Sequence, residues 1–209
     1  MVASKGFIAA NQDHLISSLT INSYPFTLSA WVYATGALAT NPVAVIVTNQ
    51  DLDNRFHNIQ LRTSFHIAES KDTSSVYATW SSAPPLNTWI YLTGVFASST
   101  ARYLYVNGIL RATNTNYAGI VAQKMVVGGI QNPVPRQFFE GSIAHPQIWL
   151  RSLLAEEIME TMQVPYSSKG LTWAPSTDRS TVVDYSPNKL AIIDNGTDDS
   201  FVGPPVYMP

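Results

Sequence analysis

The sequence has 209 residues, a formal net charge of −2 and only 12% charged side chains. This balance excludes the basic surface of a nucleic-acid-binding protein and the polybasic patch of a membrane-surface protein. Cysteine is absent, which excludes disulfides and thiolate metal sites. No apolar run approaches the ~20 residues of a membrane-spanning helix. The first 18 residues carry one lysine and no sustained apolar stretch. We therefore predict no signal peptide and expect a protein made in a cytoplasm.

Alternation of apolar and polar residues predicts strands along most of the chain. The predicted strands cover 26–33, 42–49, 56–70, 74–82, 88–96, 102–113, 124–130 and 141–150. Within 102–113, Asn107-Gly108 is typical of a type I′ turn, so this stretch is expected to be a hairpin. Pro146 removes a backbone donor, which predicts that the strand at 141–150 is an edge strand or carries a bulge. Short, regular turn spacing favours an all-β sandwich or barrel.

One stretch, 152–163, has the spacing of an amphipathic helix. Ser152 is the expected N-cap. Glu156, Glu157 and Glu160 are expected to form its solvated face. Residues 165–209 are richer in Ser, Asp, Pro and Gly than the preceding chain, with strand-like pieces at 181–184 and 190–193. This segment is too poor in apolar residues to be a separate domain, so it is predicted to be an arm or a sub-domain.

Five segments in order resemble the laminin-G-like and concanavalin A-like lectin domains, over residues 7 to about 162. They are FTLSAWVY (26–33), PPLNTWIYLTGVF (84–96), ARYLYVNGIL (101–110), VVGG (126–129) and FFEGSIAHPQIWLRSLLAEEI (138–158). The resemblance implies an all-β fold: a two-sheet antiparallel jelly-roll sandwich over residues 1–164 with one short helix. Residues 165–209 would pack on that sandwich or on a neighbouring subunit. Trp89 is expected on the inner face, opposite Leu104 and Val106.

The acidic loop 49–56, NQDLDNRF, contains the metal candidates. Asp51, Asp53 and Asn54 offer oxygen ligands that calcium would accept. The competing interpretation is a turn, because Asp and Asn favour loops for backbone reasons. The family usually has an acidic pair after its G-x-I motif, but this chain has Ala144 and His145, which weakens any calcium role carried over to that position.

Catalytic patterns are missing from the sequence. Glycosidases need two carboxylates across a cleft, and no strand carries alternating acids. The four histidines, His14, His57, His66 and His145, show no metal-binding spacing. His57 and His66 are predicted on one sheet face, with structural or surface roles. We therefore expect no catalytic residues, no enzymatic activity and no cofactor other than the calcium considered above.

Aromatic side chains are the candidates for sugar stacking. They are Trp31, Tyr33, Tyr77, Trp80, Tyr103 and Tyr105, all in predicted strands. Most are expected in the core, and a one-residue register error would reverse the face of each. The carbohydrate-binding residues are therefore unassigned at this stage.

Two functions remain open. The first is a non-enzymatic virion structural protein of a phage, decorating the capsid and acting as a homo-oligomer, with other virion proteins and glycans as its partners. It is favoured by the absent signal peptide and cysteines, by the proline-rich end of the chain, and by the family's frequent appearance on virions. The alternative is a secreted, extracellular carbohydrate-binding or adhesion module.

Overall fold

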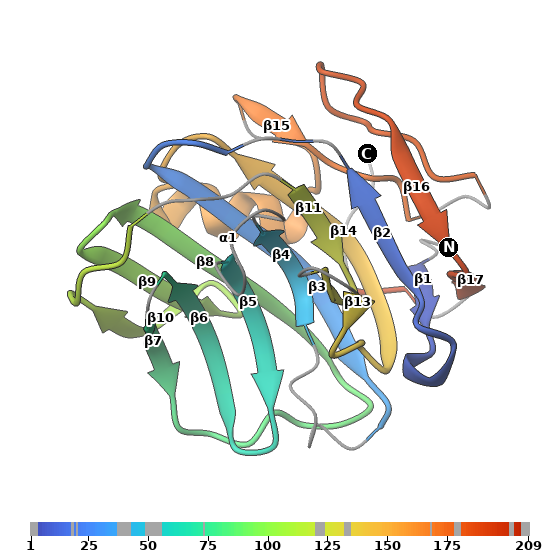
Figure 1. Cartoon of the computed structure of the whole chain (residues 1–209), viewed down its shortest axis with the longest axis horizontal. Coiled ribbons are helices and arrows are strands. Elements are labelled where there is room, and N and C mark those ends of the chain that lie inside the picture. The colour runs from blue at the N-terminus through green and yellow to red at the C-terminus, as the bar shows by residue number, and fades with distance from the viewer. Residues whose placement is uncertain are drawn as a thin grey trace.

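A computed structural model describes residues 4–17, 19, 21–36, 43–48, 56–72, 74–119, 124–131, 135–167, 169–177, 181–200 and 203–205. Its strands form two large antiparallel sheets and a small ribbon (Figure 1). The eight-stranded sheet has the order β10 (Ile109–Asn114), β9 (Ala101–Val106), β8 (Trp89–Ser98), β3 (Phe26–Ala34), β14 (Gly141–Trp149), β1 (Ser4–Phe7) and β17 (Asp198–Ser200), and β15 (Leu171–Trp173) pairs with β14. The seven-stranded sheet has the order β16 (Ile192–Asn195), β2 (His14–Ser17), β11 (Lys124–Val127), β4 (Val43–Thr48), β5 (Phe56–Arg62), β6 (Phe65–Lys71) and β7 (Ser75–Trp80). The ribbon pairs β12 (Ile130–Gln131) with β13 (Pro135–Arg136), and a short 3-10 helix covers Ala9–Asn11.

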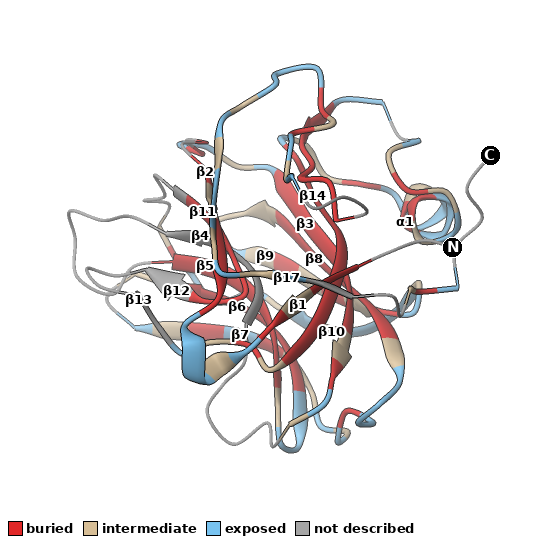
Figure 2. Cartoon of the chain, turned by 90° about the vertical axis from the view of Figure 1, so that its right-hand side faces the viewer, coloured by how far each residue is buried: buried red, intermediate tan, exposed pale blue. Residues whose placement is uncertain are grey.

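The molecule has three layers, which Figure 2 shows edge-on. The seven-stranded sheet packs against one face of the eight-stranded sheet, and helix α1 (Ala155–Gln163) covers the other. This arrangement confirms the predicted two-sheet sandwich with one short helix. The described residues contain no helix long and apolar enough to cross a membrane.

The main core fills the space between the sheets. Alternate residues of β3 point into it, among them Phe26, Leu28 and Val32. Leu104 and Val106 lie there too, as predicted. Because side chains alternate along a strand, the intervening residues of β3 face the helix layer instead.

A second apolar cluster lies between the eight-stranded sheet and α1. Trp31, Tyr91 and Trp149 are buried in it, together with Ile158 of the helix. Trp89 packs against this cluster, so its predicted place on the inner face is wrong. The strand was predicted correctly, but Ile90, Leu92 and Phe96 are the residues of β8 that enter the main core. A difference of one residue reverses the face of a side chain.

The Asn107-Gly108 turn is confirmed, because both residues have the positive φ of a type I′ turn, at 51° and 75°. The bulge predicted at Pro146 is also present, as a register shift between Ala144 and Gln147. The strand is not at an edge, since β14 lies between β3 and β1. The bulge therefore accommodates proline inside the sheet.

Two local predictions differ from the structure. Residues 56–70 are not one strand: Thr63 and Ser64 form a turn between β5 and β6. The helix N-cap is Leu154 and not Ser152, because the Thr27 hydroxyl accepts a hydrogen bond from the Leu153 N–H (3.1 Å) and the chain stays extended there. Glu157 completes the cap by accepting a hydrogen bond from the Leu154 N–H at 2.8 Å.

Residues 165–200 supply strands to both sheets of the same chain. β15 pairs with β14, β16 pairs with β2, and β17 pairs with β1. Asp184 organises the chain between these strands, because its carboxylate accepts hydrogen bonds from the backbone N–H groups of Ala174, Ser186 and Leu190 at 2.9 Å each. Of the predicted strand-like pieces, 190–193 overlaps β16 only from Ile192 onward, whereas 181–184 makes only a single bridge, from Asp184 to Pro175.

Candidate functional site

The outer face of the seven-stranded sheet carries polar and aromatic side chains at β5, β6 and β7. Ile59 pairs with Ala68, and both point into the core. Because side chains alternate along a strand, the residues of β5, β6 and β7 that alternate with such core residues point outward. This outward set includes Asn58, Gln60 and Arg62 on β5, Phe65, Ile67 and Glu69 on β6, and Tyr77 and Thr79 on β7.

Glu69 is the polar centre of this face. It is buried, and a buried carboxylate is costly unless it is paired and hydrogen-bonded. Gln60 Nε2 donates a hydrogen bond to Glu69 Oε2 at 2.5 Å, and Arg62 Nη2 lies 3.6 Å from the same oxygen. Arg62 Nε also donates to Gln60 Oε1 at 3.2 Å. This network fixes the guanidinium of Arg62 at the surface.

Two exposed rings line the same hollow as the fixed guanidinium. The Arg62 guanidinium carbon lies 5.5 Å from the centre of the Tyr77 ring, a cation–π contact. Tyr77 is 37% exposed and Phe65 is 38% exposed. These three residues, with Ile67 and Thr79, line a hollow of about 210 Å³, which we call the sheet-face groove.

The sheet-face groove suits a sugar chemically. Aromatic rings pack against the C–H face of a pyranose, while directional hydrogen bonds hold its hydroxyls. The guanidinium of Arg62 supplies donors, and the hydroxyls of Tyr77 and Thr79 both donate and accept. The groove is shallow and small, so it fits one or two sugar units of a longer chain.

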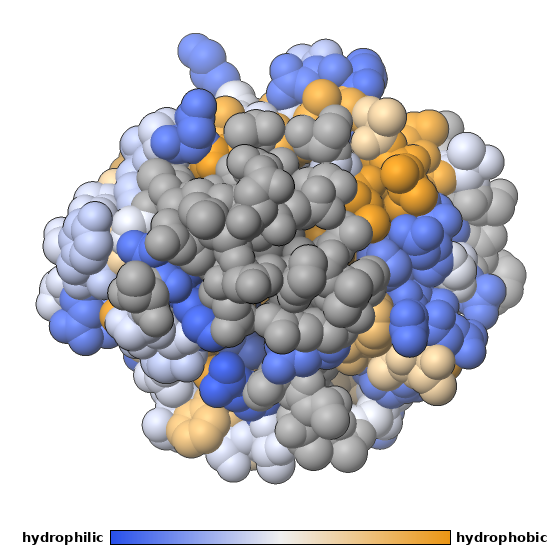
Figure 3. All heavy atoms as spheres, in the orientation of Figure 1, coloured by the Kyte–Doolittle hydropathy of each residue, from blue (hydrophilic) through white to orange (hydrophobic). Residues whose placement is uncertain are grey.

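The far end of the same sheet offers a different surface. Figure 3 shows apolar atoms over β16, where Ile193 is exposed. Residues 182–184 and 189–192 line a hollow of about 330 Å³ nearby. None of these lining residues is aromatic, so this hollow lacks a stacking surface for sugars.

The histidines have structural environments. His57 and His66 do share a sheet face, the inner one, as predicted. His57 is buried among Tyr24, Phe26 and Phe96, and its Nδ1 lies 2.9 Å from Ser70 Oγ. Burial, with the nearby charge of Arg102, lowers the pKa of His57 to about 3. Its ring is therefore neutral at pH 7.

The two other histidines lie at separate positions. His14 Nδ1 is 2.6 Å from the Gln12 carbonyl. His145 lies in the β14 bulge at a φ of 48°, and its Nδ1 is 2.8 Å from the Tyr166 hydroxyl. Neither position belongs to the sheet-face groove.

Three of the six predicted aromatic candidates belong to the second cluster or pack against it. Trp31 is buried there and donates from Nε1 to the Met162 carbonyl at 3.1 Å. Tyr103 and Tyr105 pack against the same cluster, and the Tyr33 ring lies tilted against Trp89, with 5.4 Å between ring centres. Tyr77 is the predicted aromatic that the structure places in the groove.

The acidic candidates fall into two groups, one on the helix and one in the loop at 49–56. Glu156 and Glu160 are exposed, as predicted, but Glu157 is half-buried in a double ion pair with Arg151, at 2.7 and 2.8 Å. The calcium candidates Asp51, Asp53 and Asn54 lie outside the described residues, so calcium binding stays a prediction. Within the described ranges, no group of three or more His, Asp or Glu residues could hold a metal ion.

Arg62, Phe65 and Glu69 are the site residues that sequence reasoning missed. Reading 56–70 as one strand placed Phe65 and Ile67 on the same face as Ile59 and Leu61. The turn at Thr63-Ser64 places Phe65 and Ile67 outside and leaves Ile59 and Leu61 inside. The sequence signal for this turn was the Thr63-Ser64 pair, which stands between two runs of alternating apolar and polar residues.

The family is decided by a sequence comparison. The family model described as the concanavalin A-like lectin/glucanases superfamily matches residues 9–159. The chain belongs to this superfamily. A comparison with curated proteins found no match.

Solved structures with the same fold come from several organisms. A heptameric SAP-like pentraxin from Limulus polyphemus has a TM-score of 0.67 and 15% identity, covering 95% of this chain and 94% of its own. A putative carbohydrate binding protein from Bacteroides ovatus has a TM-score of 0.72 and 14% identity, covering 99% of this chain and 62% of its own. The CBM40 of a Ruminococcus gnavus sialidase, bound to α2,3-sialyllactose, has a TM-score of 0.59 and 15% identity, covering 77% of this chain and 95% of its own. At these identities the likeness concerns the fold.

Proposed function

We propose that this protein is a non-enzymatic carbohydrate-binding module and that the sheet-face groove is its sugar-contact surface. The observation that carries the proposal is that two exposed rings, Tyr77 and Phe65, line one hollow with a guanidinium that a buried carboxylate holds in place. Family membership and the carbohydrate-binding neighbours support the same class of function.

Binding follows from the geometry of the groove. A sugar ring that packs on Tyr77 removes apolar area from water on both partners. Its hydroxyls can accept from Arg62, whose orientation is already fixed by Glu69 and Gln60. Because little side-chain entropy remains to be lost there, the bound complex keeps more of its interaction energy.

Binding without cleavage is the matching expectation. Glycoside hydrolysis needs two carboxyl groups ~5–9.5 Å apart across the sugar. Glu69 is the one carboxylate among the outward residues of β5–β7 that line or underlie the groove, and it is already engaged by Gln60 and Arg62. We therefore expect no hydrolysis of any glycan that binds.

The proposal corresponds to the secreted, extracellular alternative raised by the sequence. The comparisons support this class better than capsid decoration. Attachment to a phage virion, and assembly with further copies of the chain, stay predictions.

A glycan array with matched variants tests the proposal. We expect the purified protein to retain a subset of glycans, and Tyr77→Ala to weaken that binding at least tenfold, or about 1.4 kcal/mol. Tyr77→Phe should keep most of the binding if stacking dominates. The control is Tyr117→Ala, which removes a 68% exposed ring that does not line the groove.

Two results would contradict the proposal. One is an array without any signal above background for the wild-type protein. The other is a Tyr77→Ala variant that folds normally by circular dichroism and keeps full binding.

A further inference from the structure

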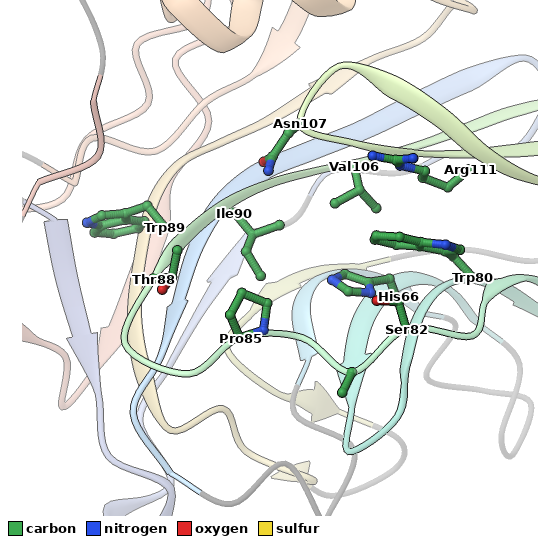
Figure 4. A pocket seen from close by; sticks show the side chains of 11 residues that line it. His66, Trp80, Ser82, Pro85, Thr88, Trp89, Ile90, Val106, Asn107 and Arg111 are labelled. Carbon is green, nitrogen blue, oxygen red and sulfur yellow. The ribbon is translucent and has the colours of Figure 1, made fainter.

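A third hollow opens where the edges of the two sheets meet, between β7 and the β8–β10 region (Figure 4). Its volume is about 200 Å³, and we call it the rim pocket. Eleven residues line it, including one arginine, one histidine and no acid. The rim pocket therefore favours a ligand with negative charge or several acceptors.

Arg111 supplies the positive charge. Its guanidinium carbon lies 4.5 Å from the centre of the Trp80 ring, and Figure 4 shows it on the face of Trp80 opposite His66. No hydrogen bond or ion pair found among the described residues uses this guanidinium. Stacking on Trp80 holds a planar fork that still has all its donors available for a carboxylate.

His66 supplies an acceptor. It is only 1% exposed, lines the rim pocket, and lies 4.8 Å from Trp80 between ring centres. Within the described part of the chain its Nδ1 has no hydrogen-bond partner. A hydrogen bond to the Ser82 backbone engages the ring, and burial lowers the pKa of His66 to about 4. At pH 7 the neutral ring can accept a hydrogen bond from a hydroxyl group.

Asn107 supplies a further donor. Its Oδ1 accepts a hydrogen bond from the Tyr91 N–H at 2.8 Å, which orients the side chain of this turn residue. The Nδ2 group then remains available to donate to a ligand. Ile90 and Val106 are buried and form the apolar wall between these polar groups.

We propose that the rim pocket binds a carboxylate that carries neighbouring hydroxyl groups, as an acidic sugar does. The carboxylate pairs with Arg111, and a hydroxyl donates to His66 Nδ1. The same chemistry occurs in a uronic acid residue of a glycan and in a free open-chain hydroxy acid. This inference is independent of the sheet-face groove, since the two hollows share no lining residue.

Calorimetry with four small ligands tests the chemistry. The ligands are methyl β-D-glucuronide, the matching neutral methyl β-D-glucoside, D-gluconate and propionate. We expect the glucuronide to bind at least tenfold more tightly than the glucoside and than propionate. If gluconate binds as tightly as the glucuronide, the result supports the proposal and assigns the site to free hydroxy acids. Equal affinity for the glucuronide and the glucoside, or no detectable binding of either carboxylate-bearing hydroxy compound, would overturn it.

Variants then locate the site. Arg111→Met keeps the apolar stem over Trp80 but removes the fork, and it should lower glucuronide affinity at least tenfold. Arg111 is exposed, so this variant is expected to fold. The control is Lys169→Gln, which removes one exposed positive charge elsewhere. An Arg111→Met protein with unchanged affinity would overturn the proposal, whereas Tyr77→Ala should not alter glucuronide binding.

Discussion

A chain that ends at Val164 is expected not to fold into the native sandwich. The truncation removes β15, β16 and β17, so β1 and β2 each lose a hydrogen-bonded neighbour. It also removes Trp173, which is fully buried in the main core. Loss of one buried Trp costs about 3–5 kcal/mol, and a whole domain has only about 5–15 kcal/mol of stability.

Circular dichroism and thermal unfolding of the truncated chain measure this effect. The point variant Trp173→Ala isolates the core contribution and should lower the free energy of unfolding by about 3–5 kcal/mol. Trp173→Phe, which keeps a ring in the core, should lose less. A truncated chain with a native spectrum and an unchanged melting temperature would show that residues 165–209 are dispensable.

The second large effect is loss of stability in mild acid. The pKa values of buried His57 and His66 are lowered to about 3 and about 4, whereas both are near 6.5 in the unfolded chain. At a pH between the native and the unfolded pKa values, each of the two histidines binds a proton in the unfolded chain but not in the native state. Stability is therefore full well above pH 6.5 and falls as the pH drops through that value. For the two histidines together, we expect the free energy of unfolding to fall by about 4 kcal/mol between pH 7 and pH 5.

Urea unfolding at pH 7, 6 and 5 measures this dependence. In His57→Gln the free energy of unfolding should vary about half as steeply with pH, because one of the two protons no longer contributes. The amide can still hydrogen-bond to Ser70 at that position. A free energy of unfolding that is constant from pH 7 to pH 5 in the wild-type protein would contradict the account.

The order of the strands was predictable because each one carries its own alternation and turn signals. The Asn107-Gly108 hairpin and the Pro146 bulge are local in this sense, since their backbone chemistry is set by two or three residues. The first strands, β1 and β2, were missed because four residues are too few to show a period. They become strands through pairing with β14 and β11, far along the chain.

The face of each side chain was harder to predict than the strand that carries it. Trp89 is on the helix side of its sheet, and Phe65 is on the outer side of the other sheet. The error at Trp89 is one residue of register, and the error at Phe65 is an unrecognised turn. Either one reverses the sheet face assigned to every side chain that follows it in the strand. The candidate site depends on which residues share a face, so Tyr77 was foreseen as an aromatic candidate while Arg62 and Glu69 were not.

The central claim is that glycans contact the outer face of β5–β7. Its most direct test is an NMR titration of the isotope-labelled protein with a neutral glycan that the array identifies. We predict that backbone amide shifts change at Arg62, Phe65–Ile67 and Tyr77–Thr79. Changes confined to the rim pocket, or to the face of the eight-stranded sheet beneath α1, would contradict the claim.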